Sequence, residues 1–161
     1  TAEVPCPVKP VQNVPQTLGA DRWAADIGAL SQDPNSTLLV IDAGTCLTYD
    51  VISSEGVLLG GAISPGVQLR LNAMHEHTAL LPLVEAEAEA VLMGYDTRTA
   101  MLSAAVNGTR FEMEGYIRQL LCEYSDLHVF ITGGNTFSFS QDVRSHVTHD
   151  PYLVFRGLRA L

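Results

Sequence analysis

Short apolar runs separated by turn residues dominate the first half of the chain. Residues 37–41 (Thr-Leu-Leu-Val-Ile) form a nearly continuous apolar run, as expected of a strand that is buried on both faces. Turn residues follow at 42–45, and the apolar pattern resumes over 47–52 and again over 57–63. This spacing predicts a meander of three strands joined by short loops.

Helical spacing of apolar residues appears in three other places. Thr17 is placed to cap a helix that runs to about Leu30. Val67, Leu71 and Met74 repeat at helical spacing, and a longer helix is predicted from Thr97 to about Ser125. Within that longer helix, Asn107-Gly108 predicts a kink or a functional notch.

The last part of the chain predicts a further strand and a final strand. Residues 128–131 are apolar and end in Thr132-Gly133-Gly134, and a short helix and a last strand near 152–155 follow. This order of elements predicts an α/β fold with a mixed five-stranded sheet and flanking helices. It matches one half-domain of the ribonuclease-H-like, actin-like fold, with residues 39–41 and 129–131 buried in the centre of the sheet.

Composition and charge exclude several classes of function. The 161 residues are 47% hydrophobic and 17% charged, as expected of a globular chain of one domain. With 9 basic and 18 acidic residues the net charge is −9, which disfavours a nucleic-acid-binding face. Lys9 is the single lysine, and no Gly-Lys-Ser/Thr occurs, so a P-loop is excluded. Cys6, Cys46 and Cys122 are too widely spaced for a disulfide framework or zinc site, and we expect a reduced, cytoplasmic protein.

The turn at 42–48 (Asp-Ala-Gly-Thr-Cys-Leu-Thr) carries candidate chemistry. Gly44 allows a ligand to approach the backbone, and the amides of a tight turn can converge on a phosphate, with hydroxyl donors from Thr45 and Thr48. Asp42 ends a buried strand, where a carboxylate needs a partner that a cation could supply. The alternative is an ordinary Asp-Gly hairpin.

Two further motifs fit the same chemistry. Gly133 and Gly134 follow a strand, where close approach of a nucleotide is favoured, although a plain strand-to-helix turn is the alternative. Gly19-Ala20-Asp21-Arg22 opens a predicted helix and could provide a general base beside an arginine that fixes an anionic substrate. An acidic residue that complements the helix dipole is the alternative there. His75-Glu76-His77 is interpreted as a solvated helix face, because alternate helical positions point in different directions.

Taken jointly, these motifs resemble the type III pantothenate kinase family, also called Bvg accessory factor-like. The shared segments, in order along the chain, are 15–22, 41–48, 60–66, 77–82, 96–97 and 132–134. The resemblance implies membership of the acetate and sugar kinase, heat-shock-70 and actin superfamily, whose members have two ribonuclease-H-like halves. Residues 1–33 would then end the amino-terminal domain and residues 34–161 would form the carboxy-terminal domain.

The resemblance also implies an activity and a site. Members phosphorylate pantothenate with ATP in the first step of coenzyme A synthesis, using Mg²⁺ and a monovalent cation, K⁺ or NH₄⁺, and they form homodimers. Asp21 would be the base, and Asp42 would bind the monovalent cation. The implied pantothenate contacts are Gly19, Ala20, Arg22 and Thr97, the last of which a partner subunit could supply, and the implied ATP contacts are Gly44, Thr45, Gly133 and Gly134.

Two departures and one alternative accompany the resemblance. The Asp-x-Gly-Asn-Ser/Thr motif that begins the family's amino-terminal half does not occur here, so we expect a part of a longer protein. The family's pocket tyrosine is replaced by the neighbourhood of Gln12, Asn13 and Val14. A non-catalytic accessory relative is the alternative function. We also expect dimerisation through the helix that begins at Thr97, where the small residues Ala104, Ala105 and Gly108 permit close helix approach.

Overall fold

The computed structural model describes residues 9–10 and 17–160 of the chain. The segment Gln12–Val14, in which the pocket tyrosine is replaced, lies outside the described residues, as do Pro15-Gln16 and Cys6. None of the described helices is both long enough and apolar enough to cross a membrane.

The described strands form one mixed sheet, in the order β1-β4-β3-β2-β5-β6. The strand bounds are β1 Lys9–Pro10, β2 Leu38–Ala43, β3 Cys46–Ile52, β4 Val57–Pro65, β5 His128–Thr132 and β6 Val147–His149. Strands β2, β3 and β4 form an antiparallel meander, and β5 pairs with β2 in parallel. The predicted α/β class and the predicted meander are therefore confirmed. Four of the five predicted strands correspond to β2–β5, and the sheet also contains β6, which lies just before the predicted last strand, and the two-residue β1, which pairs with β4.

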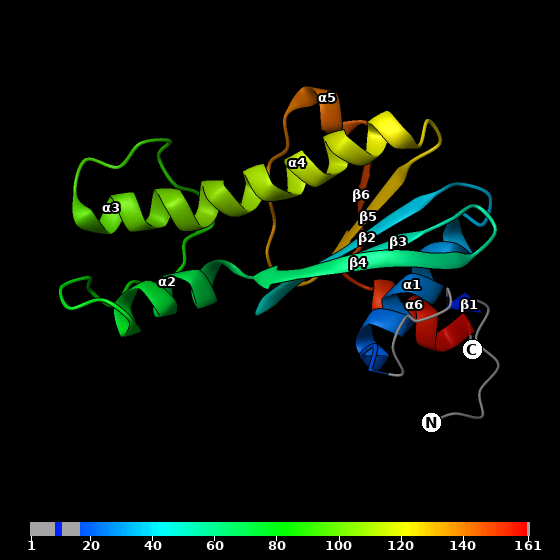
Figure 1. Ribbon diagram of the computed structural model, residues 1–161, viewed down its shortest axis with the longest axis horizontal. Helices are drawn as coiled ribbons and strands as arrows, with labels where there is room; N and C mark the ends of the chain where they lie inside the picture. Colours follow the sequence, from blue (N-terminus) through cyan, green and yellow to red (C-terminus); the bar gives the residue numbers. More distant parts are fainter. Residues whose placement is uncertain (1–8, 11–16, 161) are drawn as a thin grey trace.

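The core lies on both faces of the two central strands. The apolar segments 39–41 of β2 and 129–131 of β5 are at most 2% exposed, as predicted. They are buried because β2 lies between β3 and β5, while helices cover the two faces of the sheet (Figure 1). Alternate residues of each strand enter one core with α4 (Gly108–Glu123) or a second core with α1 (Ala20–Gln32).

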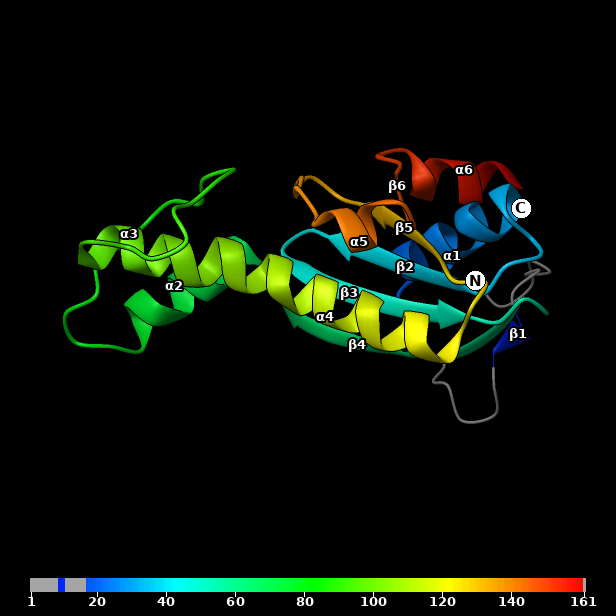
Figure 2. The same cartoon turned by 90° about the horizontal axis from the view of Figure 1, so that it is seen from above.

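Helices α1 and α6 (Leu153–Ala160) lie side by side on one face of the sheet (Figures 1 and 2). Two glycines make this packing possible, because a Cβ at Gly28 would collide with the backbone of Leu153 and a Cβ at Gly157 with that of Ala24. Helix α1 thus shares a core with the sheet formed by the later residues. The division into domains at residue 33 stays a prediction.

Two element bounds were predicted wrongly. Helix α1 begins at Ala20 with Gly19 as its N-cap, so Thr17 does not cap it. Residues 152–155 do not form a strand, because β6 ends at His149 and α6 begins at Leu153. The aromatic and branched residues of this segment are compatible with the spacing of a strand or of a helix. The segment forms a helix, because a helix places Leu153 and Gly157 against α1.

The segment between β4 and β5 forms an arm that extends away from the sheet (Figures 1 and 2). It contains α2 (Val67–Glu76), α3 (Thr97–Leu102), a π-helical turn η1 (Ser103–Asn107) and the start of α4. The last three are continuous, so the predicted long helix is confirmed, and the π-helical turn ends at the predicted notch. There Asn107 Nδ2 donates a hydrogen bond to the carbonyl oxygen of Val91 at 2.9 Å. The short helix α5 (Gln141–Arg144) follows β5.

Candidate active site

The two glycine turns lie side by side at one edge of the sheet. Strands β2 and β5 run parallel, with Asp42 opposite Thr132, so both turns leave the same edge. Gly133 has a φ of +97°, and a Cβ there would lie 2.6 Å from the carbonyl carbon of Ala43. A glycine is required at this position both by the backbone conformation and by the close approach. The structure thus joins the two motifs that the sequence placed far apart.

Helix α2 begins against the first of these turns. The backbone N–H of Gly66, the N-cap of α2, donates to the carbonyl oxygen of Thr45 at 2.9 Å. A Cβ at Gly66 would collide with the carbonyl oxygen of Gly44. Thr45 is exposed and Gly44 is half-buried, so both remain accessible from outside the sheet. The start of α2 thus supports the turn on one side, and Gly44 and Thr45 stay accessible on the other. A turn that binds a phosphate through its amides needs such access.

Asp42 and Asp21 lie near each other, although they come from β2 and α1. The pKa of the half-buried Asp42 carboxyl is raised above its ordinary value, first by burial and then by the negative charge of Asp21. A nearby positive charge would favour the ionised form of the Asp42 carboxyl. Among the described residues no three His, Cys, Asp or Glu side chains form a metal-binding cluster.

Asp21 stands exposed in the first turn of α1. Its Oδ1 accepts a hydrogen bond from the backbone N–H of Arg22 at 2.9 Å. A Cβ at Gly19 would collide with the same oxygen, so glycine at the N-cap leaves the carboxylate this position. The carboxylate is therefore held at one oxygen and accessible at the other.

The Arg22 side chain is paired with Asp50 of β3. Arg22 Nε donates to Asp50 Oδ2 at 2.9 Å and Nη2 donates to Oδ1 at 2.5 Å. The hydrogen bond to Asp50 raises the pKa of Arg22, and burial only partly offsets it. Asp26, one helical turn after Arg22, is completely buried, and burial followed by the charge of Asp50 raises its pKa well above the ordinary range. The sequence analysis did not identify Asp50 or Asp26 as residues of the candidate site. The one signal that could have found them is an acidic residue inside a segment of apolar residues.

Thr97 is not brought to the other candidate residues within one chain. It is the first residue of α3, directly after the N-cap Asp96, and it is exposed. Helix α3 lies in the arm, at the opposite end of the molecule from α1 (Figure 2). A role for Thr97 beside Asp21 therefore requires a second copy of the chain.

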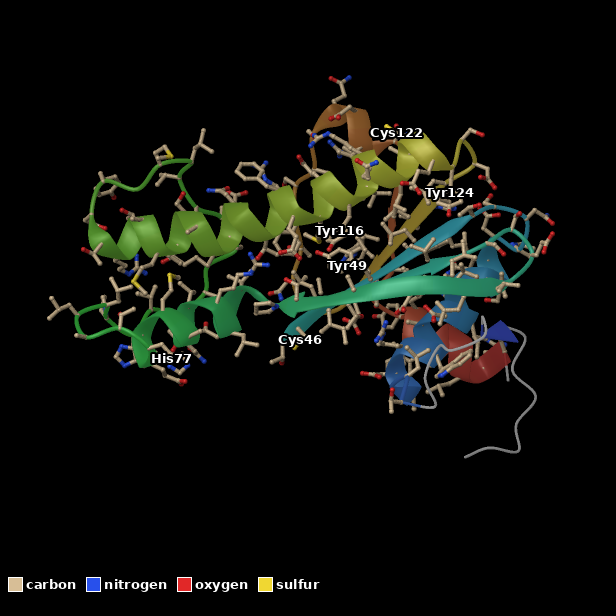
Figure 3. All side chains as sticks on the ribbon, in the orientation of Figure 1. Cys46, Tyr49, His77, Tyr116, Cys122 and Tyr124 are labelled. Carbon is tan, nitrogen blue, oxygen red and sulfur yellow. The ribbon has the colours of Figure 1, made fainter. Side chains whose placement is uncertain are left out.

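The histidines of α2 lie on an exposed face, as predicted. His75 Nδ1 lies 2.7 Å from the carbonyl oxygen of Leu81, and His77 is the C-cap of the helix (Figure 3). Both side chains are exposed. The His75 contact joins α2 to the loop that follows it.

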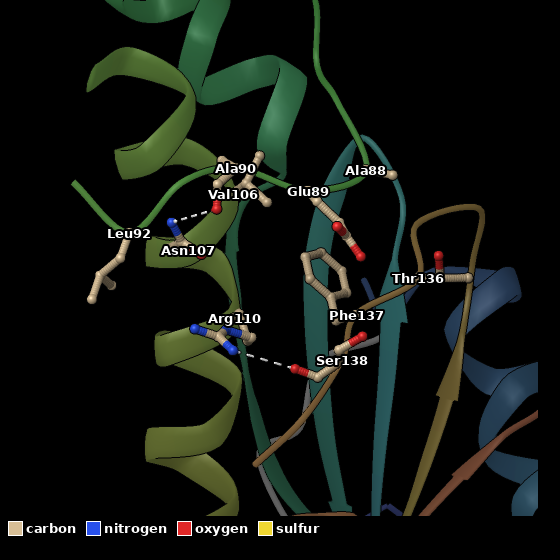
Figure 4. Close-up of a pocket in the computed structure, with 10 residues that line it drawn as sticks. All are labelled: Ala88, Glu89, Ala90, Leu92, Val106, Asn107, Arg110, Thr136, Phe137 and Ser138. Carbon is tan, nitrogen blue, oxygen red and sulfur yellow. Dashed lines mark hydrogen bonds between the residues drawn. The ribbon is translucent and has the colours of Figure 1, made fainter. Parts of the chain in front are cut away.

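A cavity of about 440 Å³ lies beside the loop that follows Gly134 (Figure 4). Its walls come from the loop at 88–92, from the helix around Asn107 and Arg110, and from the loop at 136–138. A smaller hollow of about 200 Å³ includes Gly134 itself and shares Phe137 with the larger cavity. The two hollows therefore share walls between the loop after β5 and the arm.

Sequence comparison identifies close relatives. Residues 1–119 match the family model described as type III pantothenate kinase. A type III pantothenate kinase of Bacteroides fragilis is 44% identical over 160 residues, which cover 99% of this chain and 66% of the relative. A type III pantothenate kinase of Phocaeicola vulgatus is 44% identical over 159 residues, with the same coverage of 99% and 66%. The chain thus spans just under two thirds of the length of these curated relatives.

Structural comparison supports the fold. A crystal structure from Campylobacter jejuni, described as a Baf family transcriptional activator, matches with a TM-score of 0.59 at 24% identity. The match covers 91% of this chain and 64% of that one. At this identity the likeness is evidence for the fold alone. The family model and the curated relatives lead to one conclusion: the chain belongs to the type III pantothenate kinase family.

Proposed function

We propose that the full-length protein containing this chain phosphorylates pantothenate with ATP in the cytoplasm, giving 4′-phosphopantothenate in the first step of coenzyme A synthesis. The observation that carries the proposal is the pair of glycine turns that leave the sheet side by side, the first of them directly after Asp42. Phosphoryl transfer needs little covalent chemistry from a protein, and it depends on positioning and on neutralisation of charge. The family's activity supports the same reaction.

ATP would bind along the edge where the glycine turns meet. Gly44 and Thr45 would lie against its phosphates, with Gly133 and Gly134 near the rest of the nucleotide. The hollow that includes Gly134, together with the larger cavity beside it, would offer space for the nucleoside. Because the chain has a net charge of −9 and a single lysine, backbone amides and cations would neutralise the phosphates.

The carboxylate of Asp42 suits a monovalent cation. It is half-buried, and the neighbouring charge of Asp21 makes a counter-ion favourable there. When bound, K⁺ or NH₄⁺ at this position and Mg²⁺ on the nucleotide would supply positive charge to the phosphates. Asp42 would hold the monovalent ion, and the exposed turn at Gly44-Thr45 would orient the phosphates beside it.

Asp21 would act as the general base. A carboxylate fixed at one oxygen and open at the other can accept the proton of the pantothenate hydroxyl as the oxygen attacks phosphorus. Gly19, Ala20 and Arg22 flank Asp21 along the chain and would lie at the pantothenate site. Thr97 would join them from the arm of a partner subunit, so we also propose a homodimer.

The test is an assay of the full-length protein with pantothenate, ATP and Mg²⁺, with and without K⁺. We expect formation of 4′-phosphopantothenate and ADP in equal amounts, and a loss of rate when Na⁺ replaces K⁺. Absence of product in the presence of both cations would overturn the proposal and favour a non-catalytic accessory relative. Calorimetry with pantothenate and ATP would then show whether either ligand still binds.

A further inference from the structure

We propose that Asp50 is a positioning residue that acts through Arg22 to hold the carboxylate of Asp21 in place. This inference rests on the proposed kinase function, in which Asp21 is the base. It differs from the role implied by the family resemblance, in which the Arg22 side chain serves the substrate directly. The evidence lies in the contacts around Arg22.

The pairing with Asp50 fixes both the position and the plane of the Arg22 guanidinium group. Both carboxylate oxygens of Asp50 accept hydrogen bonds, from Arg22 Nε at 2.9 Å and from Nη2 at 2.5 Å. Such a fork sets the plane of the guanidinium as well as its distance. Asp50 is 2% exposed and lies in the middle of β3, so its own position is set by the sheet. The start of α1 is therefore tied to a rigid strand.

The neighbouring strand leaves room for this pair. A Cβ on Gly61 of β4 would lie 2.8 Å from Asp50 Oδ1 and 3.0 Å from Arg22 Nη2. It would also collide with the carbonyl oxygen of Tyr49. Any larger residue at position 61 would displace the ion pair. The chain therefore provides space on β4 for a contact made between α1 and β3.

The contact between Asp50 and Arg22 is linked to Asp21 through the backbone of Arg22. The N–H of Arg22 donates to Asp21 Oδ1 at 2.9 Å, so a displacement of Arg22 moves the hydrogen bond that orients the base. A misplacement of about 1 Å at a reacting group can lower the rate by about a hundredfold. Asp50 thus influences the base without touching the substrate.

Asp26 provides a matched contrast, because it is a second acid buried beside the same arginine. Its carboxyl is 0% exposed, and within the described part of the chain neither of its oxygens has a hydrogen-bond partner. Burial, followed by the charge of Asp50, raises the pKa of Asp26 well above its ordinary range. The carboxylate that is hydrogen-bonded to Arg22 is that of Asp50.

The experiment compares Asp50→Asn with Asp26→Asn in the full-length protein. Both variants replace a buried carboxyl near Arg22 with an amide of the same shape. We expect Asp50→Asn to lower kcat by about tenfold or more, with the KM for pantothenate changed by less than roughly twofold. We expect Asp26→Asn to keep both constants within roughly twofold of the wild type. Equal kcat in Asp50→Asn and the wild type would overturn the inference.

Arg22→Lys is the second variant, for the case in which Asp50→Asn does not fold. Lysine keeps the positive charge opposite Asp50 but cannot make the two side-by-side hydrogen bonds that the guanidinium group makes. We expect a fall in kcat with little change in the KM for pantothenate. A raised KM with an unchanged kcat would show that Arg22 contacts the substrate directly, and would overturn the inference.

Amide hydrogen exchange separates this inference from the proposed function. We expect faster exchange over residues 20–23 in Asp50→Asn than in Asp26→Asn, whether or not the protein is a kinase. An inactive wild type would overturn the proposed function. Unchanged exchange in a folded Asp50→Asn variant would overturn the positioning role of Asp50.

Discussion

The side-chain amide of Asn135 donates a hydrogen bond to the carbonyl oxygen of Ala43 at 3.0 Å. The backbone N–H of Asn135 donates to the same oxygen at 3.2 Å. The loop after β5 is thereby attached to the end of β2, directly before the turn at Gly44-Thr45. The two turns that would bind ATP thus form one unit, and a change in one turn is expected to disturb the other.

Replacement of Gly133 by alanine should damage this unit. The positive φ of Gly133 and the nearness of the Ala43 backbone both oppose a Cβ. We expect Gly133→Ala to lower the free energy of unfolding by about 1–3 kcal/mol and to weaken ATP binding. Denaturant unfolding and calorimetry with ATP measure the two effects.

Gly134→Ala is the matched control for this prediction. A Cβ at Gly134 meets no atom within 4 Å, and its φ is not positive. We expect Gly134→Ala to retain the stability of the wild type. Equal stability of the two variants would show that the approach of Gly133 to Ala43 is not a constraint.

Asp21→Asn in the full-length protein tests the general base. The amide keeps the shape of the side chain and cannot accept the proton, so we expect kcat to fall by roughly 10²–10⁴-fold. Pantothenate affinity, measured by calorimetry, should change much less. Glu123→Gln, at an exposed position near the end of α4, is the control. Near-normal turnover of Asp21→Asn would remove Asp21 from the role of base.

Glu112 of α4 joins the arm to the sheet through a network of hydrogen bonds. It accepts from the Tyr49 hydroxyl at 2.9 Å and from Ser64 Oγ at 3.0 Å, and it forms an ion pair with Arg70 of α2. Figure 3 shows Tyr49 beneath α4, next to Tyr116. We expect Glu112→Gln to lower the free energy of unfolding at pH 7 by about 1–2 kcal/mol.

The stabilisation that Glu112 provides should decrease at low pH. Burial alone would raise the pKa of Glu112, but the hydrogen bonds from Arg70, Ser64 and Tyr49 outweigh burial and lower the pKa below its ordinary value of 4.5. The stabilisation is therefore present above about pH 4.5 and is lost as the pH falls through the folded-state pKa. Unfolding at pH 7 and pH 3 should show a smaller pH effect in Glu112→Gln than in the wild type.

The exposed ion pair between Glu87 and Arg98 is the control for Glu112. Glu87→Gln should change the stability little at any pH, because exposed ion pairs contribute little. An equal loss in Glu87→Gln and Glu112→Gln would contradict the special role of the network.

The apolar surface of the arm should form the dimer contact. Met93 and Tyr95, just before Thr97, are 82% and 83% exposed. We expect Met93→Glu to convert the full-length protein into a monomer in sedimentation experiments, and to lower activity because Thr97 would lose its partner site. Phe155→Glu on α6, far from the arm, should leave the oligomeric state unchanged. A dimer that persists in Met93→Glu would place the interface elsewhere.

Local patterns were sufficient to predict the centre of the sheet and the two glycine turns. The apolar runs at 38–41 and 129–131 have the length of buried strands, and the glycines after them mark where the chain must turn. Local patterns were not sufficient at residues 152–155, where aromatic and branched residues fit a strand until Gly157 is seen to contact α1. That choice depends on a contact between distant segments.

The candidate site shows the same limit. Asp21 and Asp42 could be identified because each lies within a recognisable motif. Asp50 could not, because its importance comes from Arg22, a residue in another element that sequence spacing does not connect to it. The position of Thr97 could be read from the sequence, but its distance from Asp21 depends on the direction of the arm.

The contact between Gly28 and Gly157 has a consequence for folding. The helix that carries Asp21 packs against the helix that forms last along the described chain, so α1 cannot complete its burial until α6 has been synthesised. Contacts between such distant segments slow folding, because a large loop must close before they form. On the ribosome, the proposed catalytic base would therefore reach its final position only after nearly all of this chain has emerged.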